Sequence, residues 1–226
     1  MSKLEQLIKE YSETFASILP FDFNENNVYR LDLSVNNSEL TAVNDINTDF
    51  LFNYINEKLE KNNKQIAVGG YGEDRIIYKK SKYFGTDEDA RSIHLGVDVW
   101  CKENTIVSAP MDSAIHSFKD NDNFGDYGPT IILEHRIESQ IFYTLYGHLT
   151  KKSLRNIKVR DKVNKGEIFA EIGNSSENGN WPPHLHFQII SDMKSNSGDF
   201  PGVSSKQEKE KWLAICPNPS LIIYPY

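Results

Sequence analysis

Histidines and one carboxylate recur on short apolar segments of this sequence, where they could bind a metal ion. The first such segment runs from His94 to Trp100, and its alternation predicts a strand with two unlike faces. The predicted core face is Leu95, Val97 and Val99, and the predicted polar face is His94, Gly96 and Asp98. Four residues of straight strand span about 13 Å, whereas zinc–ligand bonds are about 2 Å long. We therefore expect a bend at Gly96, which lets His94 and Asp98 share one ion.

The second segment, residues 182–190, places two histidines on one face of a predicted strand. The polar face holds His184, His186 and Gln188, and the apolar face holds Leu185, Phe187 and Ile189. Imidazoles two residues apart on a strand lie roughly 7 Å apart at the backbone. This spacing suits one metal ligand beside one catalytic base.

A third β-forming segment, residues 141–149, ends in His148 beside Gly147. It can bring His148 to the edge of the same site. Together the three segments carry four imidazoles and one carboxylate opposite apolar faces, which favours a metal site over isolated structural histidines. His116 and His135 also lie on predicted strands, and for these two we expect solvated or locally paired side chains.

The elements that must position these residues fall into two parts. Apolar residues at helical spacing predict a helix from Leu4 to Leu19 that ends at Pro20, and a second helix from about Asn47 to Lys61. A short strand is expected between them, from Val28 to Val35. From residue 65 onward, short runs of β-branched and aromatic residues alternate with turn residues, which predicts antiparallel strands. We therefore expect an α+β N-terminal extension over residues 1–64 and a mainly β domain over residues 65–226, with a long surface loop at 191–211.

Composition excludes several other classes of protein. The chain has 226 residues, a net charge of -7 and a pI near 5.4, so it lacks the clustered basic residues that nucleic acids and anionic membranes attract. The N-terminal residues do not resemble a secretory signal, and we expect a cytoplasmic protein with no membrane partner. Cys101 and Cys216 are too few for a disulfide framework and lack the spacing of a thiolate zinc site, which predicts two buried or half-buried thiols.

In chain order, three motifs resemble the signatures of the lysostaphin and LytM type of zinc endopeptidases. They are His94-x-x-x-Asp98, Tyr146-x-His148-Leu149 and His184-Leu185-His186-Phe187. Residues 107–110 and 163–173 resemble the connecting strands of that family, so the likeness covers about residues 92–190. The resemblance implies that His94, Asp98 and His186 bind zinc and that His148 and His184 are the catalytic pair. It also implies a mainly antiparallel β-sheet with a groove over the metal.

The activity that this resemblance implies is hydrolysis of a peptide or amide bond by a zinc-activated water molecule. Zinc can lower the pKa of water from roughly 16 to about 7, and a nearby histidine can take the proton. The substrate is then a peptidoglycan-type peptide or a smaller intracellular molecule. Residues 70–75, 178–183 and 198–203 also resemble a sub-branch in which this domain accompanies phosphotransferase and aminotransferase modules, which would favour the smaller substrate.

Two other classes of function stay open at this stage. A zinc-binding module without turnover would need the same ligands, but it would not need both His148 and His184. A biotinyl or lipoyl carrier is suggested by residues 163–173, but a carrier needs an exposed lysine at a hairpin tip and none of the histidines. The sequence leaves the oligomeric state and the role of residues 1–64 open.

Overall fold

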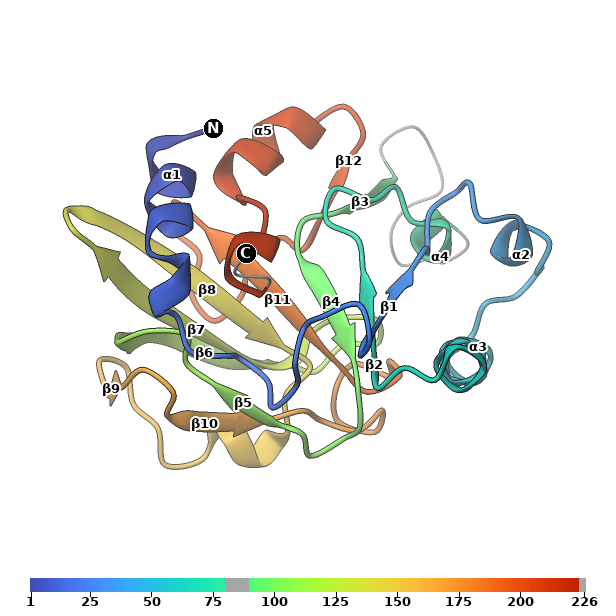
Figure 1. Ribbon diagram of the computed structural model, residues 1–226, viewed down its shortest axis with the longest axis horizontal. Coiled ribbons are helices and arrows are strands. Elements are labelled where there is room, and N and C mark those ends of the chain that lie inside the picture. The colour runs from blue at the N-terminus through green and yellow to red at the C-terminus, as the bar shows by residue number, and fades with distance from the viewer. Residues whose placement is uncertain (80–89, 224–226) are drawn as a thin grey trace.

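A computed structural model describes residues 1–79 and 90–223 of the chain (Figure 1). Its centre is an eight-stranded sheet, whose strands in spatial order are β1 (Val28–Leu31), β2 (Ile66–Gly69), β4 (Val97–Trp100), β11 (His184–Ile190), β8 (Gln140–Gly147), β7 (Gly128–Ile137), β6 (Ser113–Asn121) and β9 (Lys162–Val163). Among these neighbours only β1 and β2 pair in parallel, and every other pairing is antiparallel. Two small antiparallel sheets join β5 (Ile106–Ser108) to β10 (Ile168–Glu171) and β3 (Arg91–His94) to β12 (Val203–Ser205). The predicted mainly antiparallel fold is confirmed.

One face of the large sheet packs against the largest apolar cluster of the protein. Strand residues Val97, Val99, Leu185, Phe187 and Ile189 belong to this cluster. The short helices α1 (Lys3–Glu10) and α6 (Ser220–Ile223) cover it, and β5 and β10 close it from below in the view of Figure 1. The alternation predicted for residues 184–190 is therefore confirmed, because His184, His186 and Gln188 lie on the opposite face.

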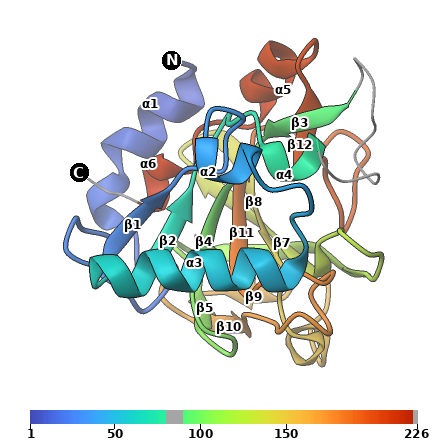
Figure 2. The same ribbon diagram turned by 90° about the vertical axis from the view of Figure 1, so that its right-hand side faces the viewer.

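The N-terminal residues extend this sheet and cover its edge. The predicted second helix is present as α3 (Thr48–Asn62), capped by the Asn47 side chain and ended by Asn63 in a left-handed conformation. Figure 2 shows α3 crossing the direction of β1 and β2, where Leu51 and Ile55 pack with Ala67. The short helices α2 (Ser38–Thr41) and α4 (Ile76–Lys79) lie on the same side.

Two N-terminal elements are shorter than the sequence predicts. The first helix ends at Glu10 rather than Leu19, and a 3-10 turn over Ser12–Thr14 follows it. The hydroxyls of Ser12 and Thr14 donate to nearby backbone carbonyls, which competes with helix continuation, and the chain leaves the 3-10 turn at Phe15 with an extended backbone. The strand predicted to reach Val35 ends at Leu31. The division between residues 64 and 65 stays a prediction, and it falls between the paired strands β1 and β2.

The segment 191–211 is not the plain surface loop that its polar composition predicts. It contains β12 and the start of α5 (Lys209–Ile215), and it buries Met193 and Phe200 against β8 and β11 residues. Pairing of β12 with β3 brings this segment to the polar face of the sheet. Its few apolar side chains therefore position it more strongly than its average polarity suggests.

Candidate metal and catalytic site

The chain bends between β3 and β4, and this bend brings His94 and Asp98 together. His94 is the last residue of β3, Asp98 lies in β4, and the His94 Nε2 to Asp98 Oδ1 distance is 3.3 Å. A Cβ on Gly96 would lie 2.6 Å from Cε1 of the His186 ring and 2.8 Å from the Phe187 carbonyl oxygen, so only glycine fits there. The predicted bend is confirmed. The shared core face predicted for Leu95, Val97 and Val99 is wrong. Because the chain bends at Gly96, Leu95 packs in a different apolar cluster from Val97 and Val99.

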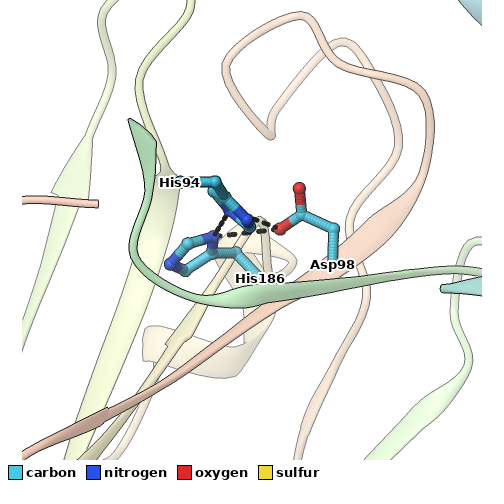
Figure 3. Close-up of side chains that lie close together, drawn as sticks. All are labelled: His94, Asp98 and His186. Carbon is cyan, nitrogen blue, oxygen red and sulfur yellow. Dashed lines mark hydrogen bonds and ion pairs between the residues drawn. The ribbon is translucent and has the colours of Figure 1, made fainter. Parts of the chain in front are cut away.

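His186 completes a compact group with these two residues (Figure 3). It lies opposite Asp98 in the antiparallel register of β11 and β4. Its Nδ1 is 3.0 Å from Asp98 Oδ1 and 3.0 Å from His94 Nε2. Four ligands in a tetrahedron with bonds of about 2.0–2.1 Å are spaced about 3.3 Å apart, so these three atoms fit a zinc ion with one position left open.

The hydrogen bonds of the His94 and His186 rings determine which nitrogen of each ring faces the proposed metal position. Nδ1 of His94 donates to the Gly70 carbonyl oxygen at 3.1 Å, which leaves the lone pair on Nε2. Nε2 of His186 donates to Oε1 of Gln188 at 2.9 Å, and the Gln188 amide is oriented by donating to the Pro201 carbonyl. Two lone pairs and a carboxylate oxygen therefore converge without a proton between them. This arrangement is repulsive unless a cation lies among them, so the donor set fits zinc.

Burial sets the charges of these groups. All three side chains are buried, and burial together with the nearby Arg75 guanidinium lowers the pKa of His94 to about 4. Burial alone would raise the pKa of Asp98, but His94 and Arg75 hold it well below its ordinary value. At neutral pH the site thus presents neutral His94 and ionised Asp98, which are the protonation states that metal binding needs.

His148 and His184 lie beside this group as a stacked pair. Their ring centroids are 4.1 Å apart, and the His148 ring centroid is 6.4 Å from that of His186. Nδ1 of His148 donates to the Asn178 carbonyl at 2.8 Å, and Nδ1 of His184 donates to the Pro182 carbonyl at 2.7 Å. Each therefore keeps a lone pair on Nε2, and Nε2 of His184 lies 3.9 Å from Asp98 Oδ1. Burial lowers the pKa of both imidazoles, so both are neutral proton acceptors at pH 7.

The backbone at His148 is unusual. It follows β8 with a φ of 62°, in the left-handed region that few residues other than glycine adopt. The His148 N–H donates to the Tyr127 carbonyl, and the His148 carbonyl accepts from the Gly173 N–H. These two hydrogen bonds hold the backbone in this conformation. Strain of this kind is found where a side chain must point in one direction.

A cavity of about 410 Å³ lies over the site. Asp98, His148, His184 and His186 line it, and its walls are rich in aromatic side chains: Tyr78, Trp100, Phe124, Tyr127, Trp181 and Phe200. Trp100 stacks on His184 with ring centroids 5.4 Å apart. Leu51 of α3 and Ile77 of α4 also line the cavity, so residues outside the motifs shape it.

His116 and His135 lie elsewhere, as expected. Nδ1 of His116 contacts the Ser117 hydroxyl on β6, and Nε2 of His135 contacts the Thr144 hydroxyl between β7 and β8. His135 is locally paired and also buried, and it is not solvated. Both cysteines are free, Cys216 buried and Cys101 half-buried, which confirms the prediction for the thiols.

Several residues around the site were not predicted from the sequence. Arg75 contacts Asp98, the Gly70 carbonyl accepts from His94, and the Gln188 amide accepts from His186. Of these three residues, only Gln188 could be placed near the site from the sequence, because the alternation of residues 184–190 put it on the same face as His184 and His186.

Comparisons with known proteins identify the central segment. Residues 92–197 match the sequence model of peptidase family M23, slightly less than half of the chain. The catalytic domain of lysostaphin from Staphylococcus simulans is a similar structure, with 26% identity and a TM-score of 0.38 over 53% of this chain and 80% of that one. A zinc-containing peptidase from Vibrio cholerae has 23% identity and a TM-score of 0.36 over 47% of this chain and 31% of that one. LytU has 23% identity and a TM-score of 0.37 over 55% of this chain and 74% of that one.

None of the curated proteins compared with the chain matches it. The TM-scores are low, so the likeness to this family depends on the sequence match and the group of His94, Asp98 and His186. Within the residues that the structure describes, no helix is both long and apolar enough to cross a membrane. Residues 92–197 thus resemble peptidase family M23, and within them His94, Asp98 and His186 form a group that could hold a zinc ion.

Proposed function

We propose that this chain hydrolyses a peptide or amide bond in the cavity over His94, Asp98 and His186, with His148 and His184 transferring protons. The observation that carries the proposal is the second histidine pair. A site that only bound zinc would need three ligands, but His148 and His184 are additional neutral bases whose Nε2 atoms are free. A zinc-binding module without turnover would not need His148 or His184.

In the proposed reaction, His94, Asp98 and His186 hold the metal. Zinc in this position supplies the positive charge that activates water and polarises the scissile carbonyl. Nε2 of His148 or His184 takes a proton from the attacking water, and the protonated ring then gives that proton to the leaving amine. The other histidine, also neutral with a lone pair on Nε2, accepts a hydrogen bond from the attacking water and orients it.

We further propose that the substrate is a short peptide rather than a large cross-linked polymer. The cavity volume falls in the range of small-ligand pockets. Side chains of α3 and α4 form part of its wall, and the Thr48 hydroxyl at the start of α3 donates to the Asn180 carbonyl at 2.6 Å. This contact ties α3 to the loop before β11, so the N-terminal residues limit the length of the groove. The narrower resemblance to the sub-branch with phosphotransferase and aminotransferase modules stays a prediction, as does the cytoplasmic location.

The test compares zinc-loaded and metal-free protein on a panel of short peptides and on peptidoglycan fragments. We expect hydrolysis that needs zinc and that favours the short peptides. His184→Ala and His148→Asn should lower turnover by roughly 10²–10⁴-fold and leave zinc content unchanged. Asparagine is chosen at residue 148 because it tolerates the left-handed backbone.

His116→Asn is the matched control, because it removes a histidine of the same sheet that lies outside the site. Full activity in both His148→Asn and His184→Ala would overturn the catalytic assignment. Loss of zinc in either one, to the degree that a ligand substitution causes, would show that this histidine is a ligand.

A further inference from the structure

Residues 70–75, here called the support segment, lie directly before the family domain and run beside β3. Their backbone is paired on both sides. On one side, Gly72 donates to the His94 carbonyl and Arg75 donates to the Ser92 carbonyl. On the other side, the Asp74 carbonyl accepts from Val35, and Ile76, the residue after the segment, donates to the Leu33 carbonyl. The segment is therefore fixed between the N-terminal residues and the strand that carries His94.

The support segment contacts two of the three proposed metal ligands. The Gly70 carbonyl accepts from Nδ1 of His94. Nη1 of Arg75 donates to Oδ2 of Asp98, the carboxylate oxygen that does not face His94 and His186. The matched family segment begins at residue 92, so these partners lie outside it.

Arg75 is buried to an extent that is rare for arginine. It is 1% exposed, and its Cζ lies 5.7 Å from the ring centroids of Tyr78 and of Trp100. A buried guanidinium needs compensating charge, and Asp98 and Glu73 provide it. Nε of Arg75 donates to Oε2 of Glu73 at 2.9 Å.

Glu73 continues this chain of contacts toward the N-terminus. Its Oε1 accepts from the backbone N–H of Leu33 at 3.0 Å. Leu33 is completely buried, so this anchor does not move independently of the N-terminal core. The contacts thus lead from Leu33 through Glu73 and Arg75 to Asp98.

We propose that Arg75 is a positioning residue that holds Asp98 to ligation through Oδ1 alone, and that the support segment makes the chain before the family domain part of the metal centre. This inference rests on the metal site of the proposed function. A carboxylate whose second oxygen is occupied by a guanidinium offers the metal one oxygen and keeps a coordination position open for water. Without Arg75, both oxygens could bind the ion, and the buried carboxylate would lose its counter-charge.

The test measures zinc affinity by competition with a chromophoric chelator in wild-type protein, Arg75→Lys and Arg75→Met. We expect a loss of roughly 10–100-fold in Arg75→Met and a smaller loss in Arg75→Lys, which keeps the charge with a single donor group. Arg160→Met is the matched control, because Arg160 precedes the edge strand β9 and forms an ion pair with Glu134 at 3.6 Å, with no contact to a ligand among the described residues. It should bind zinc as wild type does.

Two further measurements separate positioning from general structural support. The unfolding midpoint of the metal-free protein reports structural damage, and X-ray absorption at the zinc edge reports the number of oxygen ligands. We expect an added oxygen ligand in Arg75→Met, which leaves Oδ2 of Asp98 without a donor. Unchanged zinc affinity and unchanged coordination in folded Arg75 variants would overturn the proposal.

If Arg75→Met does not fold, Glu73→Gln serves in its place, since it keeps Arg75 and Asp98 and removes only the charge behind them. The proposal expects a loss of zinc affinity of about threefold to tenfold in this variant, below the range of a direct outer-shell contact, and unchanged affinity would count against it. Failure of the proposed function is distinct, because it would appear as wild-type protein that binds zinc and hydrolyses nothing.

Discussion

The six histidines of the chain form two groups that differ in what their ring nitrogens contact. In the site group, His94, His148, His184 and His186 each donate to a carbonyl or amide oxygen, which can only accept. In the other group, His116 and His135 contact hydroxyls, which can donate or accept, and His135 also interacts with the backbone of Asp112. A carbonyl partner fixes the tautomer and leaves a lone pair in a known direction, whereas a hydroxyl partner does neither. All four site histidines therefore have a fixed tautomer, which a hydroxyl partner alone does not give His116.

The largest effect should follow substitution of a ligand. In His186→Ala or Asp98→Asn, one of three protein ligands is lost, so zinc affinity should fall by more than the roughly 100-fold that an outer-shell change costs. At a zinc concentration of 100 times Kd, the wild type should gain about 2.7 kcal/mol in its free energy of unfolding, and these variants should gain almost nothing. Urea unfolding with and without zinc measures the gain. An equal loss of zinc affinity in His116→Asn would remove the distinction between the two groups.

A smaller loss of stability and of zinc affinity is expected from a substitution at Gly96, where the His186 ring packs against the backbone. Gly96→Ala places a methyl group against the His186 ring and the Phe187 carbonyl, and the carbonyl cannot move without disturbing β11. We expect a loss of about 1–3 kcal/mol in the free energy of unfolding of the metal-free protein, together with weaker zinc binding. Thermal unfolding and the chelator competition measure the two effects. Wild-type values for both would mean that the close packing of Gly96 on His186 is not needed.

The smallest effect concerns a histidine outside the site. Burial lowers the pKa of His135 to about 3 from 6.5, so between these values the unfolded chain binds a proton that the folded chain does not. The stability that His135 contributes is therefore present above pH 6.5 and is lost as the pH falls. From pH 7 to pH 5 this loss should be up to about 2 kcal/mol in metal-free protein. It should be absent in His135→Gln, and equal pH slopes in the two proteins would contradict the assigned burial effect.

Much of the site could be predicted because its residues lie in local patterns. The period of two along residues 184–190 placed His184, His186 and Gln188 on one face, and the spacing of His94 and Asp98 required a bend at Gly96. The long helix α3 was predictable from its periodicity and its asparagine caps. Each of these features depends on residues within one element.

The rest depends on contacts between distant parts of the chain. Arg75 reaches Asp98 across 23 residues, and Leu33 reaches Glu73 across 40, so no local pattern reports either contact. Arginine is ordinarily exposed, which made Arg75 an unremarkable residue in the sequence. The early end of α1 had a similar cause, because Ile18 and Leu19 are buried by tertiary packing in a bent segment rather than on a helix face.

The position of β11 in the sheet also has a consequence for folding. This strand lies between β4 and β8, and the contact of His186 with Asp98 joins residues 88 apart in sequence. Closure of so long a loop is slow compared with formation of the hairpin of β7 and β8, so the central strand is expected to insert late. During synthesis, a chain that has not yet released residues 184–190 holds His94 and Asp98 but no complete ligand set. The complete zinc site therefore forms only after β11 has inserted between β4 and β8.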